Sequence, residues 1–238
     1  MPIFEELRGG QIAENEESTL SHVNAIATPT RHLMPFRSAD FATLTEALDY
    51  AAQGDTGSNF YTGRGDIYAS ITYRELRLQA IELAHKLMGL GLTKGDRVAL
   101  VAETNPEFIR FFYACQYAGL IPVALPASVK VGAHCAYVAQ LKQLLEASDA
   151  EIGIASEGYL SFLQEASEGL SMRMVDAPKA FHALPSDVQP LHQAEPDDIS
   201  YIQYTSGSTR FPRGVVIKHR TAMANLHGIV SHGLEMSG

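Results

Sequence analysis

The sequence predicts an α/β fold in which a mostly parallel sheet carries helices on both faces. Short apolar runs at 98–102 and 121–125 are typical of strands that are buried on both sides. Between residues 72 and 175 such runs alternate with amphipathic segments of about ten to fifteen residues, the pattern of strand–helix–strand units. Because strands joined by covering helices run in the same direction, the sheet is expected to be largely parallel.

The first regular elements are expected to be a short helix and a hairpin. Four apolar residues recur at helical spacing within 43–53, and the turn-forming residues 54–58 end that segment. The β-rich runs 60–62 and 67–71 flank a glycine-containing turn at 63–66, which predicts two antiparallel strands.

The next two helices have strong start signals. Thr72 followed by Glu75 is a capping box, in which each side chain satisfies a free backbone amide, and this helix is expected to end at Gly89. Residues 105–107 combine a capping asparagine, a proline and a carboxylate at the positive end of the helix dipole. The helix that they start is expected to run to Gly119.

The same alternation continues through the middle of the chain. Helices are expected over 133–147 and 159–165, and strands over 152–154 and 172–175. Segment 177–197 contains four prolines and no clear period, so it is expected to be a connector that runs over the surface.

Composition excludes several classes of protein. Apolar residues make up 46% of the chain and charged residues 19%, which excludes disorder of the whole chain. A net charge of −9 repels phosphate backbones, so general nucleic-acid binding is not expected. No apolar run approaches the length of about 18 residues that a membrane-spanning helix needs, so no membrane span is expected.

The chain start and the cysteines favour a cytoplasmic protein. Residues 1–39 carry no secretion signal and no sustained pattern, and we expect an N-terminal extension that is loosely attached or wraps the surface; an ordinary ragged terminus remains the alternative. Cys115 and Cys135 cannot form a disulfide framework. Both fall on predicted helices, where a buried thiol is the expectation.

Polar chemistry is concentrated in segment 205–214, between the predicted strands 199–204 and 215–217; a helix over 221–232 follows. Hydroxyls, a glycine and two arginines can meet an anion there with side-chain and backbone donors. The segment is not a Walker loop, a dinucleotide fingerprint or a nucleophile elbow. From the residue types alone, a phosphate-binding loop and a plain turn both remain open.

Residues 204–209, which read Tyr-Thr-Ser-Gly-Ser-Thr, closely resemble the phosphate loop of the adenylate-forming (AMP-binding) superfamily. Pro212 and the run Gly-Val-Val at 214–216 complete that resemblance. Other parts of the chain resemble earlier segments of the same family: 71–76, 95–100, 105–108 and 118–123.

Two departures from the family pattern point to one branch. Arg210 stands where most members have glycine, and Arg213 stands where most have lysine. An arginine directly after the Ser-Thr pair is common in fatty acyl-AMP ligases, and segment 45–52 resembles the opening helix of that branch. The chain is therefore identified as most similar to a fatty acyl-AMP ligase, ahead of acyl-CoA synthetases and amino-acid adenylation domains.

The resemblance covers about 40–238 and implies the N-terminal subdomain of an AMP-binding domain that ends after the phosphate loop. The remainder of the family domain and its C-terminal domain are then absent. The catalytic residues are expected downstream of residue 238, and the fragment is expected to be inactive alone. A fatty acyl-CoA synthetase fragment, a non-catalytic nucleotide binder and a structural half of a split enzyme remain open.

The resemblance also implies a reaction, in which a fatty acid carboxylate attacks the α-phosphorus of ATP to give an acyl adenylate and pyrophosphate. ATP and Mg²⁺ are expected only in the complete enzyme, and an acyl carrier protein of a polyketide or nonribosomal peptide pathway, or coenzyme A, is the expected acceptor. No metal site is expected among the histidines. His219 and Asn225 are implied to support the loop, and Arg213 has a plain surface charge as its alternative. The residues implied to bind the ATP phosphates are Thr205, Ser206, Gly207, Ser208, Thr209, Arg210, Arg213 and Gly214.

Overall fold

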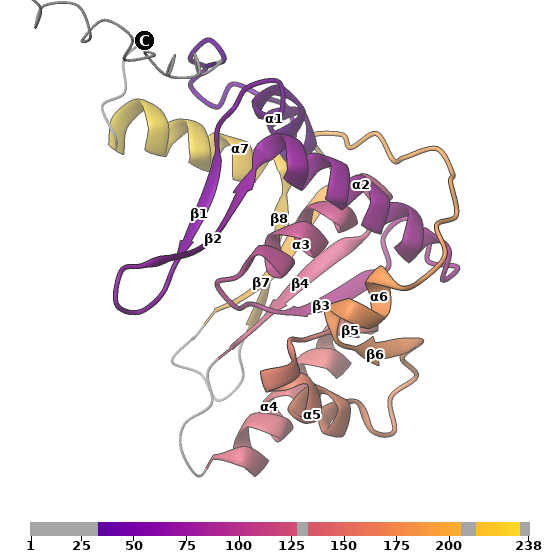
Figure 1. Ribbon diagram of the computed structural model, residues 1–238. Coiled ribbons are helices and arrows are strands. Elements are labelled where there is room, and N and C mark those ends of the chain that lie inside the picture. Colours follow the sequence, from indigo (N-terminus) through magenta and orange to yellow (C-terminus); the bar gives the residue numbers. More distant parts are fainter. Residues whose placement is uncertain (1–32, 128–132, 206–212, 234–238) are drawn as a thin grey trace, which may run out of the picture. The chain divides into compact units, whose positions relative to one another are not determined.

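A computed structural model describes residues 33–127, 133–205 and 213–233 (Figure 1). The strands are β1 (Gly57–Tyr61), β2 (Ile67–Thr72), β3 (Arg97–Val101), β4 (Ile121–Leu125), β5 (Ala150–Ile154), β6 (Met174–Asp176), β7 (Ile199–Thr205) and β8 (Arg213–Lys218). The helices are α1 (Leu44–Ala51), α2 (Tyr73–Met88), α3 (Pro106–Ala118), α4 (His134–Ser148), α5 (Glu157–Ser167), α6 (Pro178–His182) and α7 (His219–Gly228), which a π-helical turn over Ile229–Gly233 continues.

The predicted α/β fold is confirmed. Six strands form one sheet in the order β6-β5-β3-β4-β7-β8, and only the last pair, β7 and β8, is antiparallel. Strands β1 and β2 form the predicted hairpin, which the structure shows to be a separate two-stranded sheet. No helix in the described ranges is long and apolar enough to cross a membrane.

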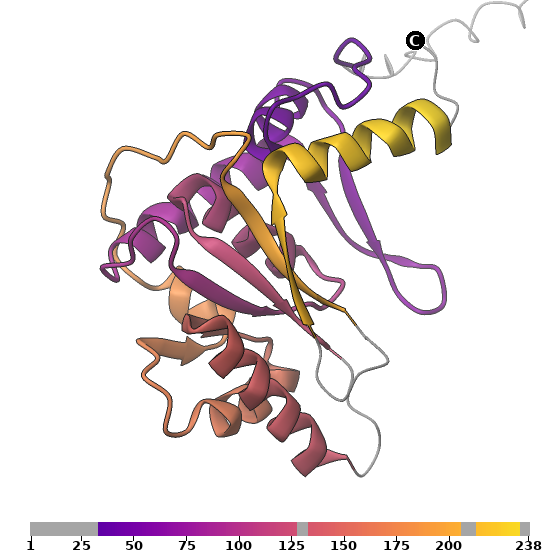
Figure 2. The same cartoon turned by 180° about the vertical axis from the view of Figure 1, so that it is seen from behind.

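The alternation of residues along β3 shows why the sheet needs helices on both faces. Val98 and Leu100 belong to a core with α2 and α3, whereas Ala99 and Val101 belong to a second core with α4 and α5. Figure 2 shows these two helix pairs on opposite sides of the sheet. A strand that is buried on both faces has no polar face, which explains the uninterrupted apolar run in the sequence.

The local start and stop signals work as predicted. Thr72 accepts a hydrogen bond from the amide of Glu75, and the Glu75 carboxylate accepts one from the amide of Thr72 at 2.9 Å. The Asn105 side chain accepts from the amide of Phe108 at 2.9 Å and caps α3. Gly119 ends α3 in the left-handed conformation, with φ of 72°, which a residue with a side chain adopts only with strain.

Three expectations need correction. The connector 177–197 contains the short helix α6, which begins at Pro178 and buries Phe181 against α3. Helix α7 begins two residues earlier than predicted, and its last turn is π-helical. Cys115 is buried as expected, but Cys135 is exposed, because the first turn of α4 lies at the surface. Most of the predicted extension 1–39 lies outside the described residues.

Candidate functional site

The parallel strands bring three chain segments together at one edge of the sheet. Strands β3, β4 and β7 run in the same direction, so their last residues, Val101, Leu125 and Thr205, lie at a common edge. We call this the carboxyl edge, and the opposite one the amino edge. In open α/β sheets, ligands bind outside the carboxyl ends of the strands.

The predicted phosphate loop is anchored at the carboxyl edge. Thr205 ends β7 and pairs in register with Arg213, which begins β8. The Thr205 hydroxyl donates to the carbonyl oxygen of Arg213 at 3.5 Å, a long contact that joins the two anchors. Three of the predicted phosphate ligands, Thr205, Arg213 and Gly214, are therefore described. The other five, Ser206, Gly207, Ser208, Thr209 and Arg210, lie outside the described residues.

Arg213 and Gly214 have different structural surroundings. Arg213 is exposed, and no carboxylate of the described residues pairs with its guanidinium. Gly214 lies opposite Tyr204, and a Cβ added to it would come within 3.1 Å of the Tyr204 ring. The hydroxyl of Tyr204 in turn donates to the carbonyl of Leu144 at 3.1 Å. Gly214 therefore has a packing reason to be glycine, independent of phosphate binding.

A polar hollow of about 360 Å³ lies at the same edge. Glu103, two residues beyond the end of β3, contributes a half-buried carboxylate for which no hydrogen-bond or ion-pair partner is found in the described part of the chain. The loops that follow β3 and β4 form the walls, together with two tyrosines from the hairpin and from α5. Its lining residues are Tyr68, Ala102, Glu103, Thr104, Asn105, Ala127 and Tyr159.

Tyrosine hydroxyls hold the backbone around this hollow. Tyr68 of the hairpin donates to the carbonyl of Thr104 at 2.7 Å. Tyr159 of α5 donates to the carbonyl of Ala127 at 2.8 Å, and Tyr137 of α4 donates to that of Pro126 at 2.6 Å. Burial raises the pKa of Tyr137 to about 12, so this hydroxyl remains a donor throughout the neutral range.

Glu103 and the tyrosines around it were not predicted from the sequence. The signal for Glu103 was its position just after a buried strand, where ligand-contacting side chains collect in parallel sheets. No comparable signal existed for Tyr68 or Tyr159, because their acceptors are 36 and 32 residues away in the sequence.

The two predicted supporting residues lie on α7, which follows the end of β8 opposite to Arg213. His219 follows the last residue of β8, about 20 Å along the strand from Arg213 at the usual rise per residue. His219 is 2% exposed, and its Nδ1 accepts a hydrogen bond from the amide of Leu44 at 3.2 Å. Asn225 is exposed on α7. Support of the loop by these residues stays a prediction, and for His219 it has to act through β8.

The described residues suit an anion better than a bare metal ion. Thr205 has a hydroxyl, and Arg213 has a guanidinium for which the described part of the chain provides no ion-pair partner; both groups can donate hydrogen bonds to phosphate oxygens. In the described ranges, no group of three or more His, Cys, Asp or Glu side chains could hold a metal ion.

Comparison with known proteins gives a consistent set of matches. The family model of the AMP-binding enzymes matches residues 48–237. Over 214 residues the chain is 41% identical to a putative acyl-CoA synthetase from Caulobacter vibrioides, covering 88% of this chain and 36% of the relative. Over 200 residues it is 26% identical to a fatty acid–[acyl-carrier-protein] ligase from Streptomyces coeruleorubidus, covering 81% of this chain and 36% of the relative.

A solved structure agrees with these sequence matches. It comes from a study of fatty acyl-adenylate ligases from E. coli and L. pneumophila and shares 43% sequence identity with this chain. The TM-score is 0.81, and the match covers 85% of this chain and 37% of that one. This chain therefore spans little more than a third of the length of the relatives that it matches.

Proposed function

The chain belongs to the AMP-binding enzyme family, and on that premise we propose that it is the amino-terminal part of a ligase that activates a fatty acid with ATP. Its similarity to the fatty acyl-adenylate ligase structure, at 43% identity, supports this proposal. In this proposal, residues 1–39 form an extension and residues 40–238 a subdomain of the AMP-binding domain. The product is an acyl adenylate, and pyrophosphate is released.

One observation carries the proposal. The two anchors of the Thr/Ser/Gly-rich loop, Thr205 and Arg213, are paired at the carboxyl edge of a sheet whose fold matches an adenylate-forming ligase. Arg213, whose guanidinium has no ion-pair partner among the described residues, and the polar hollow lie at that same edge. A nucleoside triphosphate would supply negatively charged oxygens that these donors can bind.

The contribution of these residues is positioning and charge stabilisation. When a carboxylate oxygen attacks the α-phosphorus, negative charge moves onto the departing pyrophosphate, and donors that already face it lower the barrier. Arg213 can pair with two phosphate oxygens at once, although its planar guanidinium demands a fixed approach that a lysine does not. Mg²⁺ bound with ATP would supply further neutralisation of the phosphates.

A second candidate is an acyl-CoA synthetase, because the 41% identical relative carries that name. The two candidates share the adenylation step and differ in the acceptor of the acyl group. For an acyl-CoA synthetase the acceptor is coenzyme A. For a fatty acyl-AMP ligase, the name of the Streptomyces coeruleorubidus relative suggests an acyl carrier protein.

Pyrophosphate exchange into ATP with long-chain fatty acids tests the adenylation step. We expect the 238-residue chain alone to exchange at background. A chimera that joins residues 1–238 to the remaining part of the Caulobacter vibrioides relative is expected to exchange well above background. A folded chimera without exchange would contradict the proposed function, and strong exchange by the chain alone would contradict its dependence on further polypeptide. Adding coenzyme A or a phosphopantetheinylated carrier protein to the chimera then identifies the acceptor.

Arg213→Ala in that chimera tests the anchor directly. We expect a loss of roughly tenfold or more in kcat/KM for ATP, because a charge-assisted hydrogen bond contributes about 1.5–3 kcal/mol. Lys218→Ala at the other end of β8 is the matched control, since Lys218 pairs with Asp197 at the amino edge. Unchanged kinetics in Arg213→Ala would show that Arg213 is a plain surface charge that does not contact the phosphates.

A further inference from the structure

Two histidines of α7 join this helix to the segment that begins α1. His219, the first residue of α7, contacts the amide of Leu44, the first residue of α1, at 3.2 Å. His227, two turns further along, contacts the carbonyl oxygen of Ser38 through its Nδ1 at 2.5 Å. Helices α1 and α7 lie side by side in both Figure 1 and Figure 2. These contacts connect positions that are 175 and 189 residues apart in the sequence.

The two contacts have opposite hydrogen-bond polarity. A backbone amide can only donate, so Nδ1 of His219 must be unprotonated, and its neutral ring carries the proton on Nε2. A carbonyl can only accept, so Nδ1 of His227 must donate, which it can do in the neutral and the charged ring alike. Acid therefore has opposite consequences at two neighbouring contacts of one helix.

We propose that His219 is a pH-operated clasp between α1 and α7. Its Nδ1 can accept the hydrogen bond of the Leu44 amide or bind a proton, but it cannot do both. Acidification then releases the amino end of α1 from α7 while the His227 contact persists. Leu44 is the first residue of α1, so its amide has no acceptor inside the helix and loses its one described partner when the clasp opens.

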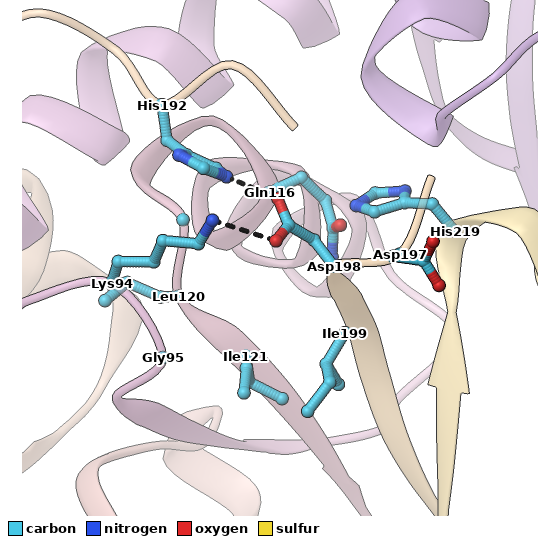
Figure 3. A pocket seen from close by; sticks show the side chains of 11 residues that line it. Lys94, Gly95, Gln116, Leu120, Ile121, His192, Asp197, Asp198, Ile199 and His219 are labelled. Atoms are coloured by element: carbon cyan, nitrogen blue, oxygen red, sulfur yellow. Dashed lines mark hydrogen bonds and ion pairs between the residues drawn. The ribbon is translucent and has the colours of Figure 1, made fainter. Parts of the chain in front are cut away.

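The surroundings of His219 favour its neutral form. The ring lines a cavity of about 210 Å³ at the amino edge, together with Lys94, His192, Asp197 and Asp198 (Figure 3). Asp198 is bound by Lys94 and His192 at 2.8 Å each. Burial lowers the pKa of His219 below its usual 6.5; the charge of Asp198 opposes this effect, and His192 adds to it.

The remaining charged groups nearby are also paired. Asp197 binds both Lys218 and Arg220, at 3.0 and 2.8 Å. On α1, the Glu46 carboxylate accepts from the amide of Ala42 at 2.8 Å. His219 lies in the first turn of α7, where the positive end of the helix dipole disfavours an imidazolium. None of these described carboxylates is left over as a dedicated counter-charge for a protonated His219.

Nuclear magnetic resonance of the 238-residue chain tests the clasp without any substitution. The ¹⁵N shifts of the His219 ring at neutral pH should report a proton on Nε2 and none on Nδ1. The exchange protection of the Leu44 amide, corrected for intrinsic exchange, should fall by up to about tenfold per pH unit below 6.5, since opening then takes up one proton. A proton on Nδ1 at neutral pH, or protection that does not change with pH, would overturn the proposal.

Variants separate the clasp from general acid destabilisation. In His219→Asn, the side-chain oxygen can take the place of Nδ1 as an acceptor that does not titrate, so protection at Leu44 should become independent of pH in this range. His227→Gln is the matched control and should retain the dependence of the unmodified chain. If His219→Asn keeps the same pH dependence, the titrating group is elsewhere and the proposal fails.

Discussion

The amino and carboxyl edges of the central sheet use their polar groups in different ways. At the amino edge, the charged side chains of Arg97 and Asp198 each form hydrogen bonds or ion pairs with several partners. At the carboxyl edge, tyrosine hydroxyls hold the loop backbone, while Glu103 and Arg213 have no ion-pair partner among the described residues. Ion pairs and charged hydrogen bonds thus hold the amino edge together, whereas among the described residues they leave Glu103 and Arg213 without a partner at the carboxyl edge.

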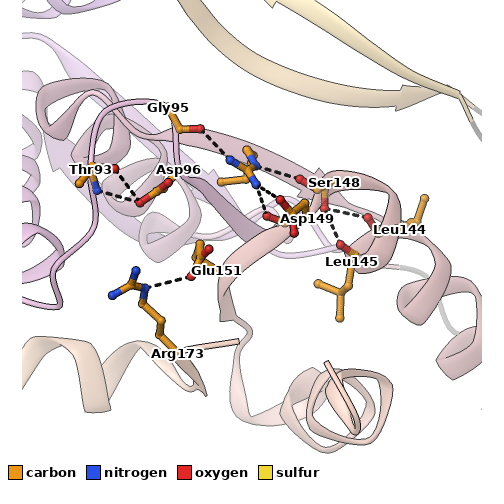
Figure 4. A network of polar contacts seen from close by, with 10 residues as sticks. Thr93, Gly95, Asp96, Leu144, Leu145, Ser148, Asp149, Glu151 and Arg173 are labelled. Atoms are coloured by element: carbon orange, nitrogen blue, oxygen red, sulfur yellow. Dashed lines mark hydrogen bonds and ion pairs between the residues drawn. The ribbon is translucent and has the colours of Figure 1, made fainter. Parts of the chain in front are cut away.

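Arg97 shows how the amino edge is braced. Its guanidinium donates to the carbonyls of Gly95, Ser148 and Asp149 at 3.2, 3.0 and 2.7 Å, and it also binds the Asp149 carboxylate. Figure 4 shows the residues of this network, with the ion pair of Arg173 and Glu151 nearby. The turn before β3 and the end of α4 are thereby held together.

Asp198 braces the other half of that edge. It accepts from Lys94, His192 and the amide of Glu195, at 2.8, 2.8 and 3.0 Å. Burial raises its pKa, but the hydrogen bonds outweigh burial and hold the pKa below the usual 3.8. The ring of His192 also lies over Gly119, where an added Cβ would come within 2.9 Å of it. Asp198 therefore ties the connector to the start of β3.

The largest effect is expected for Asp198→Ala. Its side chain is 20% exposed, and its loss leaves Lys94 and His192 without their acceptor. We expect the free energy of unfolding to fall by about 3 kcal/mol, as for the loss of charged hydrogen bonds in a mostly buried site. Urea unfolding of this variant measures it. Asp197→Ala is the control, and with 63% of that side chain exposed it should cost less than about 1 kcal/mol. Equal losses in both variants would show that the buried contacts of Asp198 contribute no more to stability than the exposed ion pairs of Asp197.

The same carboxylate gives the amino edge a pH dependence. A pKa that is lower in the folded chain than the unfolded 3.8 means that the unfolded state binds more protons below that value. The stabilisation is therefore complete above pH 3.8 and decreases as the pH falls below it. Acid unfolding of Asp198→Asn should lack this component and be less steep than that of the unmodified chain. Identical acid profiles would show that Asp198 is not stabilised by its partners.

Arg97→Met should have the next largest effect. Methionine keeps most of the apolar stem and removes every donor, so we expect a loss of about 2 kcal/mol in urea unfolding. Arg173→Met is the matched control, because Arg173 is 47% exposed and should cost less than about 1 kcal/mol. A loss in Arg97→Met no larger than in the control would mean that the brace contributes nothing to stability.

The smallest effect is expected at the carboxyl edge. Glu103→Gln should change the free energy of unfolding by no more than about 0.5 kcal/mol, because no described group is left unpaired by the substitution. Thermal and urea unfolding together provide the measurement. A loss comparable to that of Asp198→Ala would show that the polar hollow is a structural site like the amino edge.

The elements that were predicted correctly depend on neighbours in the sequence. The capping pairs at Thr72 and Asn105 act within one helical turn, and the apolar run of β3 reflects burial on both faces. Helix α6 was missed because five residues are too few for a period to show. Cys135 was assigned to the interior because a helix position alone does not tell which side faces the core.

Local chemistry was thus enough for the fold class, the order of the elements and the resemblance to a phosphate loop, since each depends on residues within a few positions of one another. The hydrogen bonds of Arg97 and Asp198 at the amino edge, and the contact of His219 with Leu44, could not be predicted from such local patterns. Asp198 meets Lys94, and His219 meets Leu44, only after the sheet has aligned the starts of its strands. Side-chain hydrogen bonds between distant positions produce no periodic pattern in a sequence. Only the folded chain therefore shows which polar groups have hydrogen-bond or ion-pair partners.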